Sequence, residues 1–260
     1  KMHRFTYSFP DDALVLIDTF VYPEFIEKDR LYTGLWEQLS VKKRQSVYFV
    51  PNFHGFGLTG IGQAIKQIRK SDRNFLLKED FLSITDYVYA FLHFLRIFRL
   101  EKKAIFKGID ISSVIKEEIY SLSGYRPAVV SILNFRFAKR LHRAKLNLKR
   151  VINRFENQVI DKGWNLGFRT FYPNIEIIGY QGAIMPPLYL CLYPTKFEFD
   201  AGVIPYKTAV IGHGYADSRR EFYPELDVIV APAFRCQWLW EERKHFPNQA
   251  WFTILIALPI

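Results

Sequence analysis

Runs of apolar residues alternate with amphipathic segments along most of the chain. The run 13–17 is apolar throughout and stops at Asp18, and the run 46–50 stops at Pro51. Short runs of this kind are typical of parallel strands that are buried on both faces. The segment 30–39 between them has a helical pattern. The first fifty residues therefore predict a strand, a helix and a second, parallel strand.

Four further apolar runs are predicted as strands, at 176–180, 208–212, 227–232 and 253–258. Helical or loop segments separate them, which again favours strands that alternate with helices. The expected fold class is α/β, with a Rossmann-like parallel sheet and flanking helices. We expect the last run to be the first strand of a truncated second domain. The predicted domains are therefore 1–250 and 251–260.

Three segments in the middle of the chain have apolar positions at helical spacing, namely 61–68, 81–100 and 111–120. The segment 81–100 is apolar on most of its faces, so we expect it to be buried or to lie at an interface. It also contains four ionisable residues, which makes it a poor candidate for a membrane-spanning helix. The chain has two cysteines, Cys191 and Cys236, and no Cys-x-x-Cys pair. We therefore expect a reducing, cytoplasmic location, with neither a disulfide framework nor a zinc site.

The composition indicates the charge of the partners. Hydrophobic residues make up 49% of the chain, which is enough for a core and excludes a disordered chain. The net charge of +10 favours a phosphorylated substrate, an anionic membrane surface or a nucleic acid. The most basic stretch, 139–150, fits a phosphate-binding helix, a membrane-apposed helix or a solvated helix face. No aromatic residues of the kind that stack on bases accompany it, so nucleic acid is the weakest of these expectations.

Polar residues follow several of the predicted strands. Ligands of parallel sheets bind beyond the carboxyl ends of the strands. The candidate substrate-binding residues there are Asp18, His54, Gln181, His213 and Arg235. The Arg235 guanidinium suits a diphosphate or an acidic sugar, and His213 suits a phosphate. A salt bridge for Arg235 and a simple turn for His213 are the structural alternatives.

The region 151–235 carries an ordered series of motifs. A Glu-Asn-Gln block at 156–158 precedes a lysine-bearing helix pattern, and a predicted strand ends in Gly-Tyr-Gln at 179–181. Pro-Thr-Lys-Phe-Glu at 194–198 and Ala-Pro-Ala-Phe-Arg at 231–235 follow. In this order the motifs resemble bacterial surface-carbohydrate glycosyltransferases of the two-domain GT-B type. The likeness is weaker, though compatible, before this region.

The resemblance implies transfer of a sugar from a nucleotide-activated donor to a growing capsule or lipopolysaccharide. The implied partners are the nucleotide sugar and the glycan acceptor, and the implied location is cytoplasmic, with peripheral contact with the inner membrane. No cofactor is expected beyond the co-substrate, and no metal, because the chain lacks an Asp-x-Asp motif. In GT-B enzymes the donor mostly contacts the C-terminal domain, so this chain is expected to bind the acceptor. The alternative is a non-catalytic carbohydrate-binding or scaffold module of the polysaccharide assembly machinery.

Glu156 is the candidate catalytic residue. An inverting glycosyl transfer needs a base near the acceptor hydroxyl, and a carboxylate can serve. The alternative is a structural carboxylate that binds Lys162 or the neighbouring backbone. Asn157 and Gln158 offer amides that are suited to sugar hydroxyls, and we predict that they bind substrate by hydrogen bonds.

Overall fold

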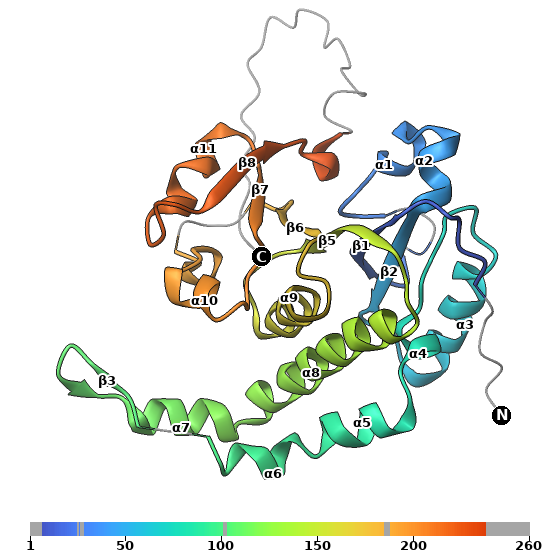
Figure 1. Ribbon diagram of the computed structural model, residues 1–260. Helices are drawn as coiled ribbons and strands as arrows, with labels where there is room; N and C mark the ends of the chain where they lie inside the picture. The colour runs from blue at the N-terminus through green and yellow to red at the C-terminus, as the bar shows by residue number, and fades with distance from the viewer. Residues whose placement is uncertain (1–6, 25, 27–28, 101–102, 185–187, 238–260) are drawn as a thin grey trace, which may run out of the picture.

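The computed structural model of the chain describes residues 7–24, 26, 29–100, 103–184 and 188–237. A six-stranded sheet in the order β2-β1-β5-β6-β7-β8 lies at its centre, and all neighbouring strands are parallel (Figure 1). The strands are β1 (Leu14–Val21), β2 (Val47–Phe53), β5 (Leu148–Arg154), β6 (Glu176–Gln181), β7 (Lys207–Ile211) and β8 (Asp227–Ala231). The predicted α/β class with a Rossmann-like parallel sheet is confirmed. The predicted strand 253–258 and the predicted second domain 251–260 lie outside the described residues.

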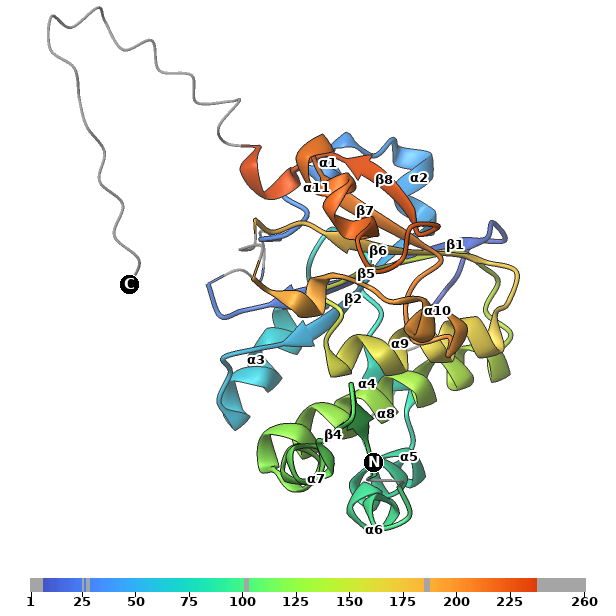
Figure 2. The same cartoon turned by 90° about the vertical axis from the view of Figure 1, so that its left-hand side faces the viewer.

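Two long helices cover one face of the sheet. They are α8 (Leu122–Arg143) and α9 (Val159–Phe171), which pack side by side beneath the strands (Figure 2). Glycines permit the close approach, because a Cβ at Gly163 would lie 1.8 Å from the carbonyl oxygen of Ser131. Trp164 and Phe168 on α9 are fully buried against the strands. This face therefore holds the largest core of the molecule.

The opposite face carries shorter elements. The predicted helix 30–39 is shorter than expected, since only α1 (Leu35–Gln38) is helical there, followed by α2 (Val41–Ser46). Gly34, with a positive φ of 75°, begins α1 and so delays the start of the helix. The remaining elements complete the sequence after β6: η1 (Leu190–Leu192), α10 (Lys196–Asp200), α11 (His213–Ala216), η2 (Ser218–Arg220) and η3 (Phe234–Cys236).

The predicted long helix 81–100 is divided into α4 (Lys78–Phe81), α5 (Ile84–Phe91) and α6 (His93–Ile97). Leu82 and Ser83 have extended backbone, and the Asp86 carboxylate accepts a hydrogen bond from the Ser83 N–H, which begins α5 anew. The predictions at 61–68 and 111–120 are confirmed by α3 (Leu58–Ile68) and α7 (Ser112–Tyr120). None of the helices in the described part of the chain is long and apolar enough to cross a membrane.

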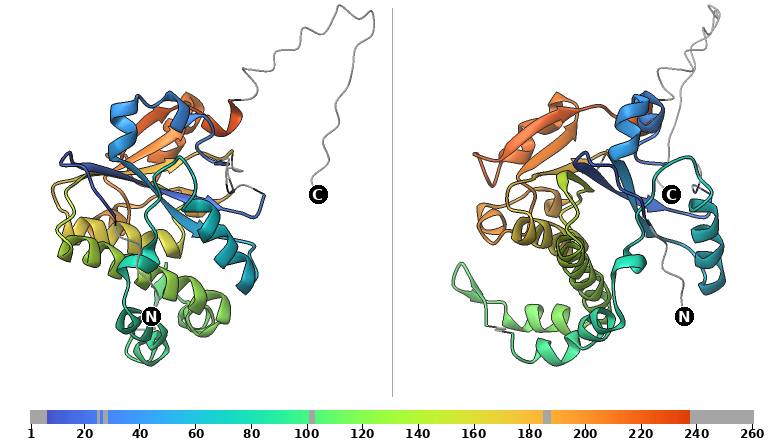
Figure 3. Two further views of the ribbon diagram at one scale, coloured as in Figure 1. Left: turned by 90° about the vertical axis from the view of Figure 1, so that its right-hand side faces the viewer. Right: turned by 45° about the vertical axis from the view of Figure 1, so that its right-hand side comes forward.

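We call residues 84–100 and 103–120 the arm. It comprises α5, α6, α7 and a short hairpin of β3 (Ile105–Phe106) and β4 (Ile109–Asp110). The arm packs against α8 on the side away from the sheet (Figures 1 and 3). It therefore forms an additional helical layer beneath the α/β core.

The connections between strands place a crevice at one position of the sheet. From β1 the chain passes to β2 on one side, and after β2 it returns to β5 on the other side of β1. The connection after β1 leads to β2 and the connection after β5 leads to β6, so they leave these two adjacent strands in opposite directions. In open parallel sheets such a switch point is where ligands bind.

Candidate functional site

A cleft of 370 Å³ lies at this switch point, and we call it the arginine cleft. Phe20 and Tyr22 line it from the end of β1, and Ile160 lines it from the start of α9. Its charged and polar lining residues are Arg30, His54, Arg154, Glu156, Gln158 and Arg235. Four of the predicted site residues, His54, Glu156, Gln158 and Arg235, therefore share one cleft.

Arg154 is a lining residue of the cleft that the sequence analysis missed. It ends β5, is only 5% exposed, and its guanidinium carbon lies 3.7 Å from the centroid of the Phe20 ring. Its Nη1 lies 2.7 Å from Oε1 of Glu156, while its Nε has no hydrogen-bond partner among the described residues. A buried guanidinium with an unused N–H suits an anionic ligand oxygen. A cation at the last position of a strand, two residues before Glu156, was the available signal.

Glu156 lies at the rim, between Arg154 and Gln158. Its side chain is 21% exposed, and Oε2 accepts a hydrogen bond of 2.9 Å from Nε2 of Gln158. An ionised carboxylate has about four acceptor sites. Glu156 can therefore accept a hydrogen bond from a ligand hydroxyl while it keeps both protein partners.

The loop that carries Glu156 is fixed by the first turn of α9. Oδ2 of Asp161 accepts hydrogen bonds from the backbone N–H groups of Glu156, at 3.1 Å, and of Gln158, at 3.0 Å. Burial raises the pKa of Asp161 to about 7, although the positive charge of Arg154 opposes this. The position of Glu156 therefore depends on a carboxyl group that has no direct ion pair with any residue the structure describes.

Asn157 points away from the arginine cleft. Its φ of 55° turns the chain, and its side chain accepts a hydrogen bond from Lys162 and donates one to Glu198. Burial raises the pKa of Glu198, but the hydrogen bond and charge of Lys162 outweigh it, so the pKa is lowered. Lys162 therefore pairs with Glu198, whereas the structural alternative for Glu156 had it paired with Lys162.

Gln181 lies in a small hollow that adjoins the cleft and is also lined by Arg154 and Glu156. Its Oε1 accepts a hydrogen bond of 2.6 Å from Nε of the buried Arg219, and its Nε2 donates to the carbonyl oxygen of Leu192. Both ends of the amide are therefore engaged within the protein. Its predicted role in substrate binding stays a prediction.

Asp18 and His213 lie outside the arginine cleft. Asp18 is buried beneath it and accepts a hydrogen bond from Asn52. Burial raises the pKa of Asp18, and the charges of Lys78 and Arg154 oppose this. His213 begins α11 and is exposed to solvent. For both residues a contact with substrate stays a prediction.

A second and larger cleft of 770 Å³ shares His54, Gln158 and Ile160 with the first, and we call it the helical cleft. It lies between the end of β2 and the first half of α8, and Tyr87 of α5 and Glu118 of α7 also line it. Its polar lining includes the buried Lys78, whose Nζ donates to Asn52 at 2.6 Å and to Asn134 at 2.7 Å. Burial lowers the pKa of Lys78, and the charge of Asp18 opposes this.

His54 stands where the two clefts meet. Its ring is edge-on to Phe20, with a distance of 4.1 Å between the ring centroids. Partial burial lowers its pKa, and the positive charges of Arg154 and Lys78 act in the same direction. The imidazole is therefore neutral at pH 7 and available as a hydrogen-bond donor or acceptor.

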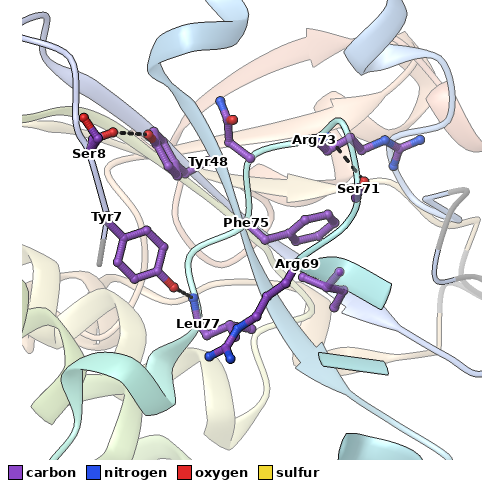
Figure 4. Close-up of a pocket in the computed structure, with 10 residues that line it drawn as sticks. Tyr7, Ser8, Tyr48, Arg69, Ser71, Arg73, Phe75 and Leu77 are labelled. Carbon is purple, nitrogen blue, oxygen red and sulfur yellow. Dashed lines mark hydrogen bonds between the residues drawn. The ribbon is translucent and has the colours of Figure 1, made fainter. Parts of the chain in front are cut away.

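A third cleft of 250 Å³ lies beside the edge strand β2 (Figure 4). Its wall includes Phe75 of the segment that covers this edge, where the Phe49 N–H donates to the Asn74 carbonyl oxygen at 2.8 Å. Its two cations already face carboxylates, Arg69 with Asp80 at 3.3 Å and Arg73 with Glu37 at 3.8 Å. This cleft is therefore less suited to an anionic ligand than the arginine cleft.

Within the described ranges, no group of three or more His, Cys, Asp or Glu side chains is placed to hold a metal ion. We compared the chain with models of protein families, with curated proteins and with solved structures, and no match was found in any of the three. The function is therefore argued from the chemistry of the two adjoining clefts.

Proposed function

We propose that the chain is the acceptor-side part of a GT-B-type glycosyltransferase that extends a surface polysaccharide from a nucleotide-activated sugar. One observation carries the proposal: Glu156 faces the arginine cleft at the switch point of the sheet, beside Arg154 and Arg235. A carboxylate and guanidinium groups in one cleft match a substrate that presents hydroxyl groups next to phosphate.

In the proposed reaction the acceptor hydroxyl donates a hydrogen bond to Oε2 of Glu156, at the acceptor site of this oxygen that Gln158 does not use. The carboxylate takes the hydroxyl proton as the oxygen attacks the anomeric carbon of the donor. The bond from that carbon to the phosphate oxygen breaks, and the nucleoside diphosphate leaves with the electron pair. Arg154 and Arg235 stabilise the phosphate charge that develops.

The larger helical cleft is the proposed site for the remainder of the acceptor. Its wall combines apolar side chains, such as Val130 and Leu133, with the amides of Asn52 and Asn134. This mixture of apolar and hydrogen-bonding groups suits the faces and hydroxyls of sugar rings. A GT-B reaction also requires a donor-binding domain, so the activity belongs to the full-length gene product.

The test is Glu156→Gln in the full-length gene product, with radiolabelled nucleotide sugars and a glycan acceptor. General-base removal lowers the transfer rate by about 10² to 10⁴-fold. We expect that loss, with donor affinity changed less than about threefold, because Gln keeps the shape of Glu and one oxygen that can accept a hydrogen bond from Arg154 or Gln158. Glu225→Gln, at an exposed position outside both clefts, is the matched control and leaves the rate unchanged.

Two results would contradict the proposal. One is the absence of transfer and of donor hydrolysis by the wild-type protein across a panel of nucleotide sugars. The other is transfer that persists at the wild-type rate in Glu156→Gln. Glycan binding by the wild type without any transfer would favour a non-catalytic carbohydrate-binding module.

A further inference from the structure

The polarity of α5 is inverted relative to a core-facing amphipathic helix. Its buried side carries Asp86, which is fully inaccessible and lies 2.6 Å from nitrogens of both Arg136 and Arg140 on α8. Its outer side carries Ile84, Val88 and Phe91, at helical spacing i, i+4 and i+7. In most surface helices the apolar stripe faces the protein, and here it faces away.

These outward apolar side chains are well exposed. Ile84 is 81% exposed, Val88 is 51% and Phe91 is 63%. The exposure continues beyond α5 into α6 and the hairpin, where Phe94, Leu95, Leu100, Ile105, Phe106 and Ile109 are also exposed. Single exposed apolar residues are ordinary, but so many exposed apolar and aromatic side chains in one short stretch of the chain are the mark of an interaction surface.

The charges next to this face are mostly positive. Between Leu92 and Gly108 the sequence has five cations, Arg96, Arg99, Lys102, Lys103 and Lys107, against one carboxylate, Glu101. Arg96 lies over the ring of Tyr89 at 4.2 Å, and Lys107 lies 5.7 Å from the centroid of the Phe106 ring. Aromatic rings with interleaved cations are suited to the boundary between lipid headgroups and acyl chains.

From this juxtaposition we propose that the arm is a membrane-docking surface that binds anionic lipid bilayers, with its apolar face in the boundary layer and its cations on lipid phosphates. The net charge of +10 assists the approach to such a surface. A second copy of the chain fits this face less well, because two copies would bring the same positively charged stretch against itself. Two residues of the basic stretch 139–150 are already paired, Arg140 with Asp86 and Arg150 with Glu176.

The test is flotation of the full chain with vesicles of phosphatidylcholine alone and with vesicles of equal parts phosphatidylcholine and phosphatidylglycerol. We expect binding to the anionic vesicles on the order of tenfold tighter, and a weakening with added salt as charges are screened. Val88→Ser combined with Phe91→Ser lowers the affinity by on the order of tenfold, since two apolar side chains no longer enter the boundary layer.

Two variants complete the design. Arg99→Glu combined with Lys107→Glu is expected to abolish the preference for anionic vesicles. Phe197→Ser removes an equally large exposed side chain, 87% exposed on α10 and outside the arm, and is expected to bind as the wild type does. Circular dichroism shows whether each variant is folded.

Failure of the wild type to bind either kind of vesicle overturns the proposal, and so does wild-type binding by the Val88/Phe91 variant. A dimer in sedimentation that dissociates in this variant, without vesicle binding, would assign the face to a second copy instead. Vesicle binding and sugar transfer are measured separately, so the failure of one leaves the other standing.

Discussion

Asp86 in the arm and Asp161 at the sheet edge occupy equivalent positions in their helices, yet their surroundings are opposite. Each is the third residue of its helix. Each also accepts a hydrogen bond from the backbone N–H of the residue that precedes the helix, which is Ser83 for Asp86 and Gln158 for Asp161. Asp86 then meets two arginines, Arg136 and Arg140. The hydrogen bonds recorded for Asp161 come from backbone N–H groups instead.

The two pKa values move in opposite directions. Burial alone would raise the pKa of Asp86, but the hydrogen bonds from Arg140, Ser83 and Arg136 hold it well below its usual range. Burial raises the pKa of Asp161 to about 7. The arm is therefore attached to α8 by ion pairs of a buried carboxylate, whereas the loop before α9 is held by backbone hydrogen bonds to a buried carboxyl group.

The largest effect is expected where that packing is tightest. Gly163→Ala places a Cβ 1.8 Å from the carbonyl oxygen of Ser131, so α8 and α9 have to move apart. We expect a loss of more than about 4 kcal/mol in the free energy of unfolding, measured by urea denaturation. Gly62→Ala, in α3 with no atom within 4 Å of the new Cβ, is the matched control and gains about 0.5 to 1 kcal/mol. Equal stability of the two variants would contradict close packing at this contact.

The next effect is on the pH dependence of stability, which we expect to differ between Asp161 and Asp86. A raised folded pKa means that the folded protein holds the Asp161 proton between about pH 4 and pH 7, so the contribution of Asp161 to stability falls as pH rises through that window. In Asp161→Asn this fall is absent. The variant therefore gains stability relative to wild type as pH rises, by at most about 4 kcal/mol for a shift of about three pKa units.

Asp86→Asn is the matched control with the opposite sign. The folded pKa of Asp86 is lowered, so its contribution is present above the ordinary pKa of an aspartate and is lost as pH falls below it. We expect Asp86→Asn to cost about 3 kcal/mol at pH 7 and less in acid. Unfolding free energies at several pH values measure both differences, and slopes of the same sign would show that the two carboxylates are not held as described.

The sheet and part of the site could be predicted from the sequence because both depend on local patterns. A buried parallel strand is a short apolar run, and the residues after such runs meet at one edge, which brought His54, Glu156 and Arg235 together. An apolar run does not predict strand β5, because Lys149, Arg150 and Arg154 interrupt its apolar positions.

The parts of the site and of the arm that the sequence does not predict depend on contacts between residues far apart in the chain. Arg154 lines the cleft because β5 lies beside β1 and sets it against Phe20, and periodicity does not give the order of strands. The apolar face of α5 likewise turns outward because Asp86 binds two arginines of α8, and these lie 50 and 54 residues further along the chain. Sequence patterns alone indicate a helix there that is apolar on most of its faces and is buried or lies at an interface, and they do not show which face turns outward.

The smallest effect is expected for an exposed side chain of the arm, compared with a buried side chain of α9. Phe91→Ser in the absence of lipid should change the free energy of unfolding by no more than about 0.5 kcal/mol, because the ring is 63% exposed and its removal uncovers little. The same substitution at Phe168, fully buried on α9, should cost about 3 to 5 kcal/mol. Thermal and urea unfolding of the two variants measure the difference. A cost above about 2 kcal/mol for Phe91→Ser would mean that another surface already covers the apolar face of α5 in solution. The arm would then be part of a protein contact, and its cations would have a role other than lipid binding.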